Sequence, residues 1–290
     1  MKTRTLTSIF IVITYAVVVS LTLFVHKIFF DVFILLLMIL SGLEMSRAVS
    51  KKFSKPMDIF IVLECVLGYI AFFVTNRLLP GNIGITAFFG VLALMFIACM
   101  CCSMFGKRTG ISNVTSTMLV LIYPVSLLVY TLGLNYFPQT ASYYNVAAIL
   151  LLLLVSAFTD TFAYLIGGML KGPKLCPTIS PKKTISGAVG GVMGGMLGAT
   201  VVLCCSIFDW LNVPMLSTSM GLNIMHYMII GFVGSLFTQL GDLIASYAKR
   251  QCEIKDFGRI LPGHGGILDR IDGMMLNAVF LYVYLLILAL

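Results

Sequence analysis

Residues 143–168 read YYNVAAILLLLLVSAFTDTFAYLIGG, and Asp160 is the single charged residue among them. A helix needs about 20 mostly apolar residues to cross a hydrocarbon core about 30 Å thick, so this run is long enough to span a bilayer. A closed β-barrel would instead show segments of about ten residues with alternating polarity, whereas this run is apolar on all sides. The stretch therefore predicts a transmembrane helix.

Runs of the same kind recur along the chain. Of its 290 residues, 60% are hydrophobic and 10% are charged, and the mean hydropathy is +1.05. A soluble globular protein carries about 25% charged residues because its surface faces water. The sequence therefore predicts an all-α, polytopic integral membrane protein with about nine transmembrane helices. The expected helices are 6–25, 28–43, 57–75, 83–105, 115–137, 143–168, 184–207, 222–244 and 274–290.

The basic residues indicate the orientation. If nine helices alternate, all but two of the 19 Lys and Arg residues fall on the side of the N-terminus, and the exceptions are Lys27 and Arg77. Lys107 and Arg108 are among those on the inner side. Basic residues collect on the cytoplasmic side of membrane proteins, so we expect a cytoplasmic N-terminus. The net charge of +8 then reflects topology, and no nucleic-acid partner is expected.

The chain divides into two parts by the character of its loops. Up to residue 142 the loops are short, and residues 1–142 are expected to form a membrane body. From Asp160 onward the loops are richer in Gly, Lys and Asp, so residues 143–290 are expected to form a catalytic region with cytoplasmic loops. The chain has no inverted repeat of the kind that marks many transporters. Glu44 and Glu64 carry no assignment from the sequence.

Two polar groups occur early in the second part. An acid at membrane depth, such as Asp160, is costly and usually marks a site or a partner, although a helix-end carboxylate that reaches water is the alternative. The stretch SPKKT at 180–184 is expected to be a loop that enters a helix, whose N-terminus favours anions. The glycines that follow recur at spacings of three and four, which favours close helix packing. The candidate phosphate ligands are Ser180, Lys182, Lys183 and Thr184.

The longest polar stretch, residues 239–272, has a composition that suits phosphate and metal together. Mg²⁺ prefers hard oxygen ligands and usually takes one or two carboxylates plus substrate phosphates. Three aspartates can provide carboxylates, and several cations can hold phosphate oxygens. Glycines at 263, 265 and 266 allow close approach of the backbone to a ligand. The candidate metal ligands are Asp242, Asp269 and Asp272, and the candidate phosphate-binding cations are Lys249, Arg250, Lys255 and Arg270.

A fixed pattern of residues runs through positions 246–272. Its members are Ser246, Lys249, Arg250, Lys255, Asp256, Gly258, Leu261, Pro262, His264, Gly265, Gly266, Asp269, Arg270, Ile271 and Asp272. Their spacing resembles the hallmark pattern of the phosphatidate cytidylyltransferases (CDP-diacylglycerol synthases). The SPKKT stretch and the segment that begins at Asp160 also resemble that family. The resemblance is strong over about residues 156–273, and the first half of the chain shares only its hydrophobic, polytopic character.

The resemblance implies a reaction in which CTP and phosphatidic acid give CDP-diacylglycerol and pyrophosphate. It implies one or two Mg²⁺ ions, with or without a monovalent cation, and a homodimer in the plasma membrane whose active site faces the cytoplasm. The implied catalytic residues are Asp242, Lys249, Arg250, His264, Asp269 and Arg270. The implied substrate-binding residues are Asp160, Ser180, Lys182, Lys183, Thr184, Ser246, Lys255, Gly265 and Gly266.

The chain departs from the family pattern at two positions, where Ser186 and Ala245 replace acids that such proteins commonly carry. Both replacements bear on metal number, metal affinity and activity. Three rival functions stay open at this point. They are a CTP-dependent lipid kinase acting on a polyprenol, a polytopic transporter, and a catalytically weakened member of the same family.

Overall fold

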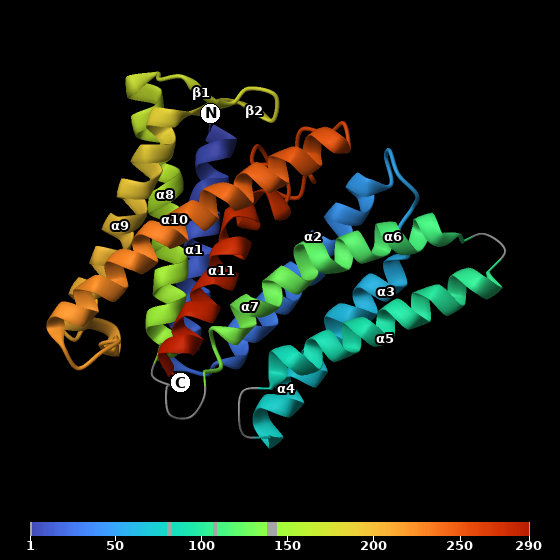
Figure 1. Ribbon diagram of the computed structural model, residues 1–290, viewed down its shortest axis with the longest axis horizontal. Helices are drawn as coiled ribbons and strands as arrows, with labels where there is room; N and C mark the ends of the chain where they lie inside the picture. Colours follow the sequence, from blue (N-terminus) through green and yellow to red (C-terminus); the bar gives the residue numbers. More distant parts are fainter. Residues whose placement is uncertain (1, 80–82, 107–108, 138–143, 290) are drawn as a thin grey trace. The chain divides into compact units, whose positions relative to one another are not determined.

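The computed structural model describes residues 2–79, 83–106, 109–137 and 144–289 (Figure 1). The expected boundary between residues 142 and 143 lies outside the described residues, as do Lys107 and Arg108. The chain forms two compact units. The first unit comprises Met1–Gly133 and Lys249–Ile271, and the second comprises Leu134–Ala248 and Asp272–Leu290. Each unit is described here by itself.

The first unit consists of the N-terminal helices and of the separate polar segment Lys249–Ile271. Its α2 helix packs closely on its neighbours, because a Cβ added at Gly42 would lie 2.9 Å from Ile61 and 3.2 Å from Val125. Two spans are interrupted by π-helical turns, and the second of these turns contains Pro124, which cannot donate a backbone hydrogen bond. The elements are α1 (Lys2–Phe24), α2 (Ile28–Val49), α3 (Asp58–Leu63), η1 (Glu64–Gly68), α4 (Tyr69–Leu78), α5 (Gly84–Phe105), α6 (Ile111–Val120), η2 (Leu121–Ser126) and α7 (Leu127–Gly133).

The second unit pairs two long helices through glycine. In α9 a Cβ at Gly194 would lie 2.5 Å from the carbonyl oxygen of Phe158, and one at Gly198 would lie 2.6 Å from that of Leu154, both on α8. Only glycine permits this approach, so the packing role expected for these glycines is confirmed. The elements are α8 (Tyr144–Leu170), β1 (Lys174–Cys176), β2 (Ser180–Thr184), α9 (Ile185–Ile207), η4 (Trp210–Asn212), most of α10 (Met220–Gln251) and most of α11 (Leu268–Ala289).

A small antiparallel hairpin, β1–β2, connects α8 to α9 (Figure 1). Lys174 pairs with Thr184, and Cys176 pairs with Ser180. The SPKKT stretch is therefore a strand rather than the loop that the sequence predicts. Thr184 ends the strand and caps α9, because its hydroxyl oxygen accepts the Gly187 N–H at 3.1 Å. Apart from this hairpin and a single bridge between Leu261 and Gly265, the described residues contain helices, turns and loops, as expected for an all-α protein.

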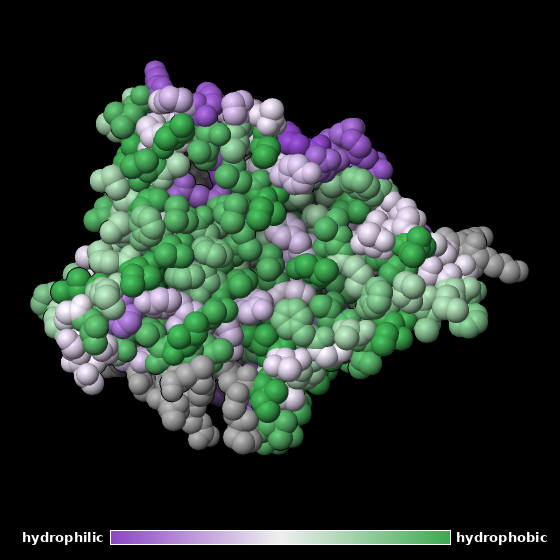
Figure 2. Space-filling view, in the orientation of Figure 1, coloured by the Kyte–Doolittle hydropathy of each residue, from purple (hydrophilic) through white to green (hydrophobic). Residues whose placement is uncertain are grey.

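Each of the nine expected spans lies on a helical stretch of the chain. Eight of these stretches are long and apolar enough to cross a membrane, and the apolar part of α1, Ile9–Phe24, is shorter. Much of the visible surface is hydrophobic (Figure 2), as a lipid-facing surface requires. Helix α10 extends past the expected end at residue 244 to Gln251, and α11 begins at Leu268 rather than 274. The added helical residues, 245–251 and 268–273, include several charged side chains. The expected spans were predicted from apolar runs, so these residues were not included in them.

Candidate functional site

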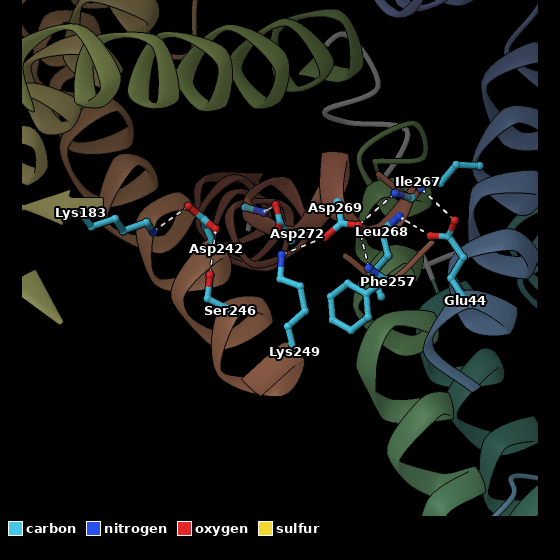
Figure 3. Close-up of polar contacts among 12 residues, drawn as sticks. Glu44, Lys183, Asp242, Ser246, Lys249, Phe257, Ile267, Leu268, Asp269 and Asp272 are labelled. Atoms are coloured by element: carbon cyan, nitrogen blue, oxygen red, sulfur yellow. Dashed lines mark hydrogen bonds and ion pairs between the residues drawn. The ribbon is translucent and has the colours of Figure 1, made fainter. Parts of the chain in front are cut away.

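The loop between α10 and α11 belongs to the first unit, and Asp269 organises it. Oδ2 of Asp269 accepts the N–H of Phe257 at 2.8 Å and the N–H of Gly266 at 2.9 Å. Oδ1 lies 2.8 Å from the Lys249 ammonium (Figure 3). The backbone turns at Gly263 and Gly265, whose φ angles of 77° and 88° are in the left-handed region that favours glycine. One carboxylate therefore closes the whole loop.

A second carboxylate holds the same loop from an N-terminal helix. Glu44, on α2, accepts the N–H of Ile267 at 3.1 Å and the N–H of Leu268 at 2.9 Å (Figure 3). Thr7 of α1 also donates a hydrogen bond to the carbonyl oxygen of Pro262 at 2.9 Å. Sequence reasoning did not assign Glu44, because its partners lie more than 200 residues away along the chain and are backbone groups without a sequence signature.

A cavity of about 580 Å³ opens beside this loop, and its wall carries more positive than negative side chains. Lys255, Arg259 and Arg270 are exposed cations that line it, and His264 is half-buried. Arg259 was not predicted as a phosphate-binding residue. Its position within the polar stretch 239–272 was the feature of the sequence that could have identified it. The lining residues are Lys255, Asp256, Gly258, Arg259, Leu261, Pro262, Gly263, His264, Gly265 and Arg270.

In the second unit the hairpin brings a lysine onto a carboxylate of α10. The Lys183 ammonium lies 2.7 Å from Oδ2 of Asp242, and both side chains are partly exposed, at 25% and 36% (Figure 3). Ser246 approaches the other oxygen of Asp242 at 3.5 Å. Gln239, one turn earlier, donates to the Ala188 carbonyl at 3.2 Å and links α10 to α9. The expected residues Lys183, Asp242 and Ser246 are thus neighbours in this unit.

The remaining expected residues are placed as follows. Asp160, Lys182 and Arg250 are exposed, whereas Ser180 is half-buried. Asp272 is half-buried, and its Oδ1 accepts the N–H of Gly273 at 2.9 Å.

The two departures from the family pattern have local explanations. The Ser186 hydroxyl accepts the N–H of Gly172 at 3.3 Å and lies 3.2 Å from the Thr184 hydroxyl, so it fastens the hairpin to α9. Ala245 is completely buried on α10, where an unpaired acid would be costly.

The donor chemistry fits Mg²⁺ to a limited extent. Among the described residues no three His, Cys, Asp or Glu side chains gather as a metal-binding group, so an all-protein cage is not formed. Mg²⁺ commonly takes only one or two carboxylates and completes its shell with substrate phosphate and water. Asp242 is partly exposed, and both it and Asp269 already attract a lysine cation. Asp242 and Asp269 lie in different units, and each carboxylate by itself fits this incomplete type of site, Asp269 by exchanging its contact with Lys249 for the ion.

Comparison with known proteins gives matches along the chain. The profile described as the cytidylyltransferase family matches residues 2–288. A phosphatidate cytidylyltransferase of Staphylococcus epidermidis is 39% identical over 155 residues, which are 53% of this chain and 55% of the relative. The protein of that name from Staphylococcus aureus is 38% identical over 158 residues, with the same coverage. The matched region thus spans about half the length of these curated relatives.

Proposed function

The chain belongs to the cytidylyltransferase family, and from this membership we propose that it is a phosphatidate cytidylyltransferase, which converts CTP and phosphatidic acid to CDP-diacylglycerol and pyrophosphate. The observation that carries the proposal is the cavity lined by Lys255, Arg259 and Arg270 at the loop after α10. Clustered cations favour a ligand rich in phosphate oxygens. The names of the partial relatives favour phosphatidate as the second substrate.

In the proposed reaction an oxygen of the lipid phosphate attacks the α-phosphorus of CTP. The bond from that phosphorus to the oxygen bridging the α- and β-phosphates breaks in line, and pyrophosphate leaves with the electron pair. A phosphate monoester is already anionic at neutral pH, so the nucleophile needs no strong base. Phosphoryl and nucleotidyl transfers depend mainly on positioning and on neutralising charge. The residues of this chain would therefore act by holding phosphate oxygens rather than by covalent catalysis.

The residue roles follow from charge and position. Lys255, Arg259 and Arg270 would hold phosphate oxygens in the cavity, and His264 would orient one of them by a hydrogen bond. Lys183 and Lys249 would neutralise charge on the substrates or on the leaving pyrophosphate. Asp242 of the second unit and Asp269 of the first would each offer a carboxylate to Mg²⁺, which when bound neutralises charge on the triphosphate. Lys182 and Arg250, which are exposed, would add positive charge for the approach of anionic substrates.

The setting of the reaction is part of the proposal. We place the protein in the plasma membrane as a homodimer whose active site faces the cytoplasm, where CTP is available. The excess of basic residues on the N-terminal side supports this orientation. A multi-pass protein can present a water-soluble nucleotide and a bilayer lipid to the same catalytic groups, which this reaction requires.

The test is product analysis with the purified protein in detergent, supplied with CTP, Mg²⁺ and phosphatidic acid. Pyrophosphate release that requires the lipid would support the proposal, and the Asp269→Asn variant serves as the control for the loop. Release of CDP with a polyprenol substrate would instead identify a CTP-dependent lipid kinase. A folded protein that binds CTP without releasing pyrophosphate would reduce the proposal to nucleotide binding and would direct attention to Ser186 and Ala245.

A further inference from the structure

We propose that Glu44 is a positioning residue for the loop after α10: from α2 its carboxylate fixes the start of α11 and thereby the shape of the cationic cavity. The nature of the ligand in that cavity rests on the function proposed above, whereas the contact itself is a property of the first unit. Glu44 is not among the residues that line the cavity, so we infer that it acts through the backbone that it holds.

The carboxylate is bound in a way that leaves little freedom. Each of its oxygens accepts one backbone N–H, from Ile267 at 3.1 Å and from Leu268 at 2.9 Å, and the residue is only 1% exposed. Leu268 is the first residue of α11, and the first N–H groups of a helix lack partners within the helix. A carboxylate there satisfies them and interacts favourably with the helix dipole. Glu44 is thus a helix cap supplied by a distant helix.

Two glycines of the loop form the space that the carboxylate occupies. A Cβ added at Gly258 or at Gly266 would collide with the oxygens of Glu44. Neither glycine has the positive φ that by itself would require glycine, since the positive-φ glycines of the chain's described part are Gly263 and Gly265. The absence of side chains at 258 and 266 therefore serves the approach of Glu44 rather than a turn.

Glu44 and Asp269 together accept hydrogen bonds from successive backbone N–H groups of this segment. Asp269 accepts the N–H of Gly266, and Glu44 accepts the next two, so three consecutive amides are held by two carboxylates. These amides are consequently not available to bind a phosphate. The anion-binding capacity of the cavity then rests on its cations, Lys255, Arg259 and Arg270, whose positions depend on the loop that Glu44 holds.

The experiment compares Glu44→Gln with Gly258→Ala and with the control Glu64→Gln in the full-length protein in detergent. Glutamine keeps the shape of Glu44 but offers only one acceptor oxygen to two N–H groups. Gly258→Ala keeps the Glu44 carboxylate, but the added methyl group displaces it from the N–H groups of Ile267 and Leu268. Glu64 is a completely buried glutamate of the same unit whose carboxylate oxygens have no hydrogen-bond partner in the described structure, so its substitution leaves the loop untouched. Hydrogen exchange of residues 255–268, the KM for CTP and kcat are measured for each.

We expect faster exchange in residues 255–268 and a KM for CTP raised about tenfold in both Glu44→Gln and Gly258→Ala, because a buried N–H loses its acceptor. The double variant should be no worse than either single one, since both act on one contact. Glu64→Gln should match the wild type in all three measurements.

Three results would overturn the inference. They are unchanged exchange in both test variants, faster exchange with an unchanged KM, and an equal effect of Glu64→Gln. If Glu44→Gln does not fold, Gly258→Ala decides the question alone. If the wild-type protein releases no pyrophosphate, the proposed function fails, and the KM is replaced by the dissociation constant of CTP, or of inorganic pyrophosphate if CTP does not bind. The role of Glu44 is then decided by hydrogen exchange and by that dissociation constant, independently of whether the proposed function is correct.

Discussion

The ammonium group of Lys249 lies 2.8 Å from Oδ1 of Asp269, and the two side chains are only 13% and 3% exposed. The same ammonium lies 5.3 Å from the ring centroid of Phe257, whose backbone N–H donates to Asp269. An ion pair of this kind gives little net stability, because desolvation offsets the attraction, but removal of one partner leaves a buried charge unpaired. The pair therefore makes the loop sensitive to single substitutions.

Asp269→Asn should destabilise the protein and abolish most of its activity. The variant leaves Lys249 without its counter-charge, at a cost of about 3 kcal/mol in the free energy of unfolding. The thermal midpoint in detergent should fall, and pyrophosphate release should decrease at least 100-fold. A protein with wild-type activity and unchanged Mg²⁺ dependence would exclude Asp269 as a metal ligand.

The matched control for that experiment is Glu253→Gln. Glu253 also pairs with a lysine, Lys52 at 2.6 Å, but these side chains are 73% and 45% exposed. The hydrogen bond from Lys52 lowers the pKa of Glu253, yet solvent screens such a pair. Neither the thermal midpoint nor the activity should change. A large effect of Glu253→Gln would show that exposed charge, rather than burial, explains the loss in Asp269→Asn.

Lys183→Met should reduce activity more than Lys182→Met, although both remove one positive charge from adjacent positions of β2. Lys183 is half-buried and lies on Asp242, whereas Lys182 is exposed. A charge-assisted contact at the site is worth about 1.5–3 kcal/mol, so kcat/KM should fall roughly 10- to 100-fold for Lys183→Met. Steady-state kinetics over a range of Mg²⁺ concentrations would measure this. Equal losses in both variants would mean that the hairpin contributes only diffuse positive charge.

The membrane architecture was predictable because its signal is strong and local. A run such as 143–168 satisfies the length and composition of a membrane span by itself, and α8 occupies most of it. The ends of the helices were less predictable. Residues 245–251 of α10 are helical but include Lys249 and Arg250. A prediction based on hydropathy ends a helix where the apolar run ends, so it did not include these residues.

The candidate site was predictable only where side chains follow a pattern in sequence. The Asp269 and Lys249 positions were singled out from spacing, but their contact depends on how the loop folds back. Glu44 gave no signal, because it binds the backbone amides of Ile267 and Leu268. The hairpin was also missed: a strand that begins with Ser180-Pro181 and contains two lysines has the composition of a loop, and it depends on pairing with β1.

Gly195→Ala should destabilise the second unit. A Cβ there would lie 2.5 Å from Cβ of Ser235 and 2.8 Å from the Thr159 hydroxyl, so α8, α9 and α10 could not keep their present separation. Overpacking of this kind costs about 1–3 kcal/mol, which thermal unfolding in detergent would detect. Gly168→Ala on α8 is the control, because the added Cβ would have no atom within 4 Å apart from its own local stretch of helix backbone. Equal stability of the two variants would contradict the glycine-mediated packing.

Arg259→Gln should weaken binding of the phosphate-bearing substrate without unfolding the protein. Arg259 is exposed and lines the cavity, so its loss removes one cation from the wall but breaks no packing. An exposed charge contact is worth about 0.5–1 kcal/mol, which corresponds to a KM for CTP raised roughly two- to fivefold. The effect should shrink as salt is added, because screening weakens the contact that was lost. Lys55→Gln, at an exposed position of the same unit away from the cavity, should leave the KM unchanged. If the two variants behave alike, Arg259 contributes only to the general positive field, and the phosphate contacts belong to Lys255 and Arg270.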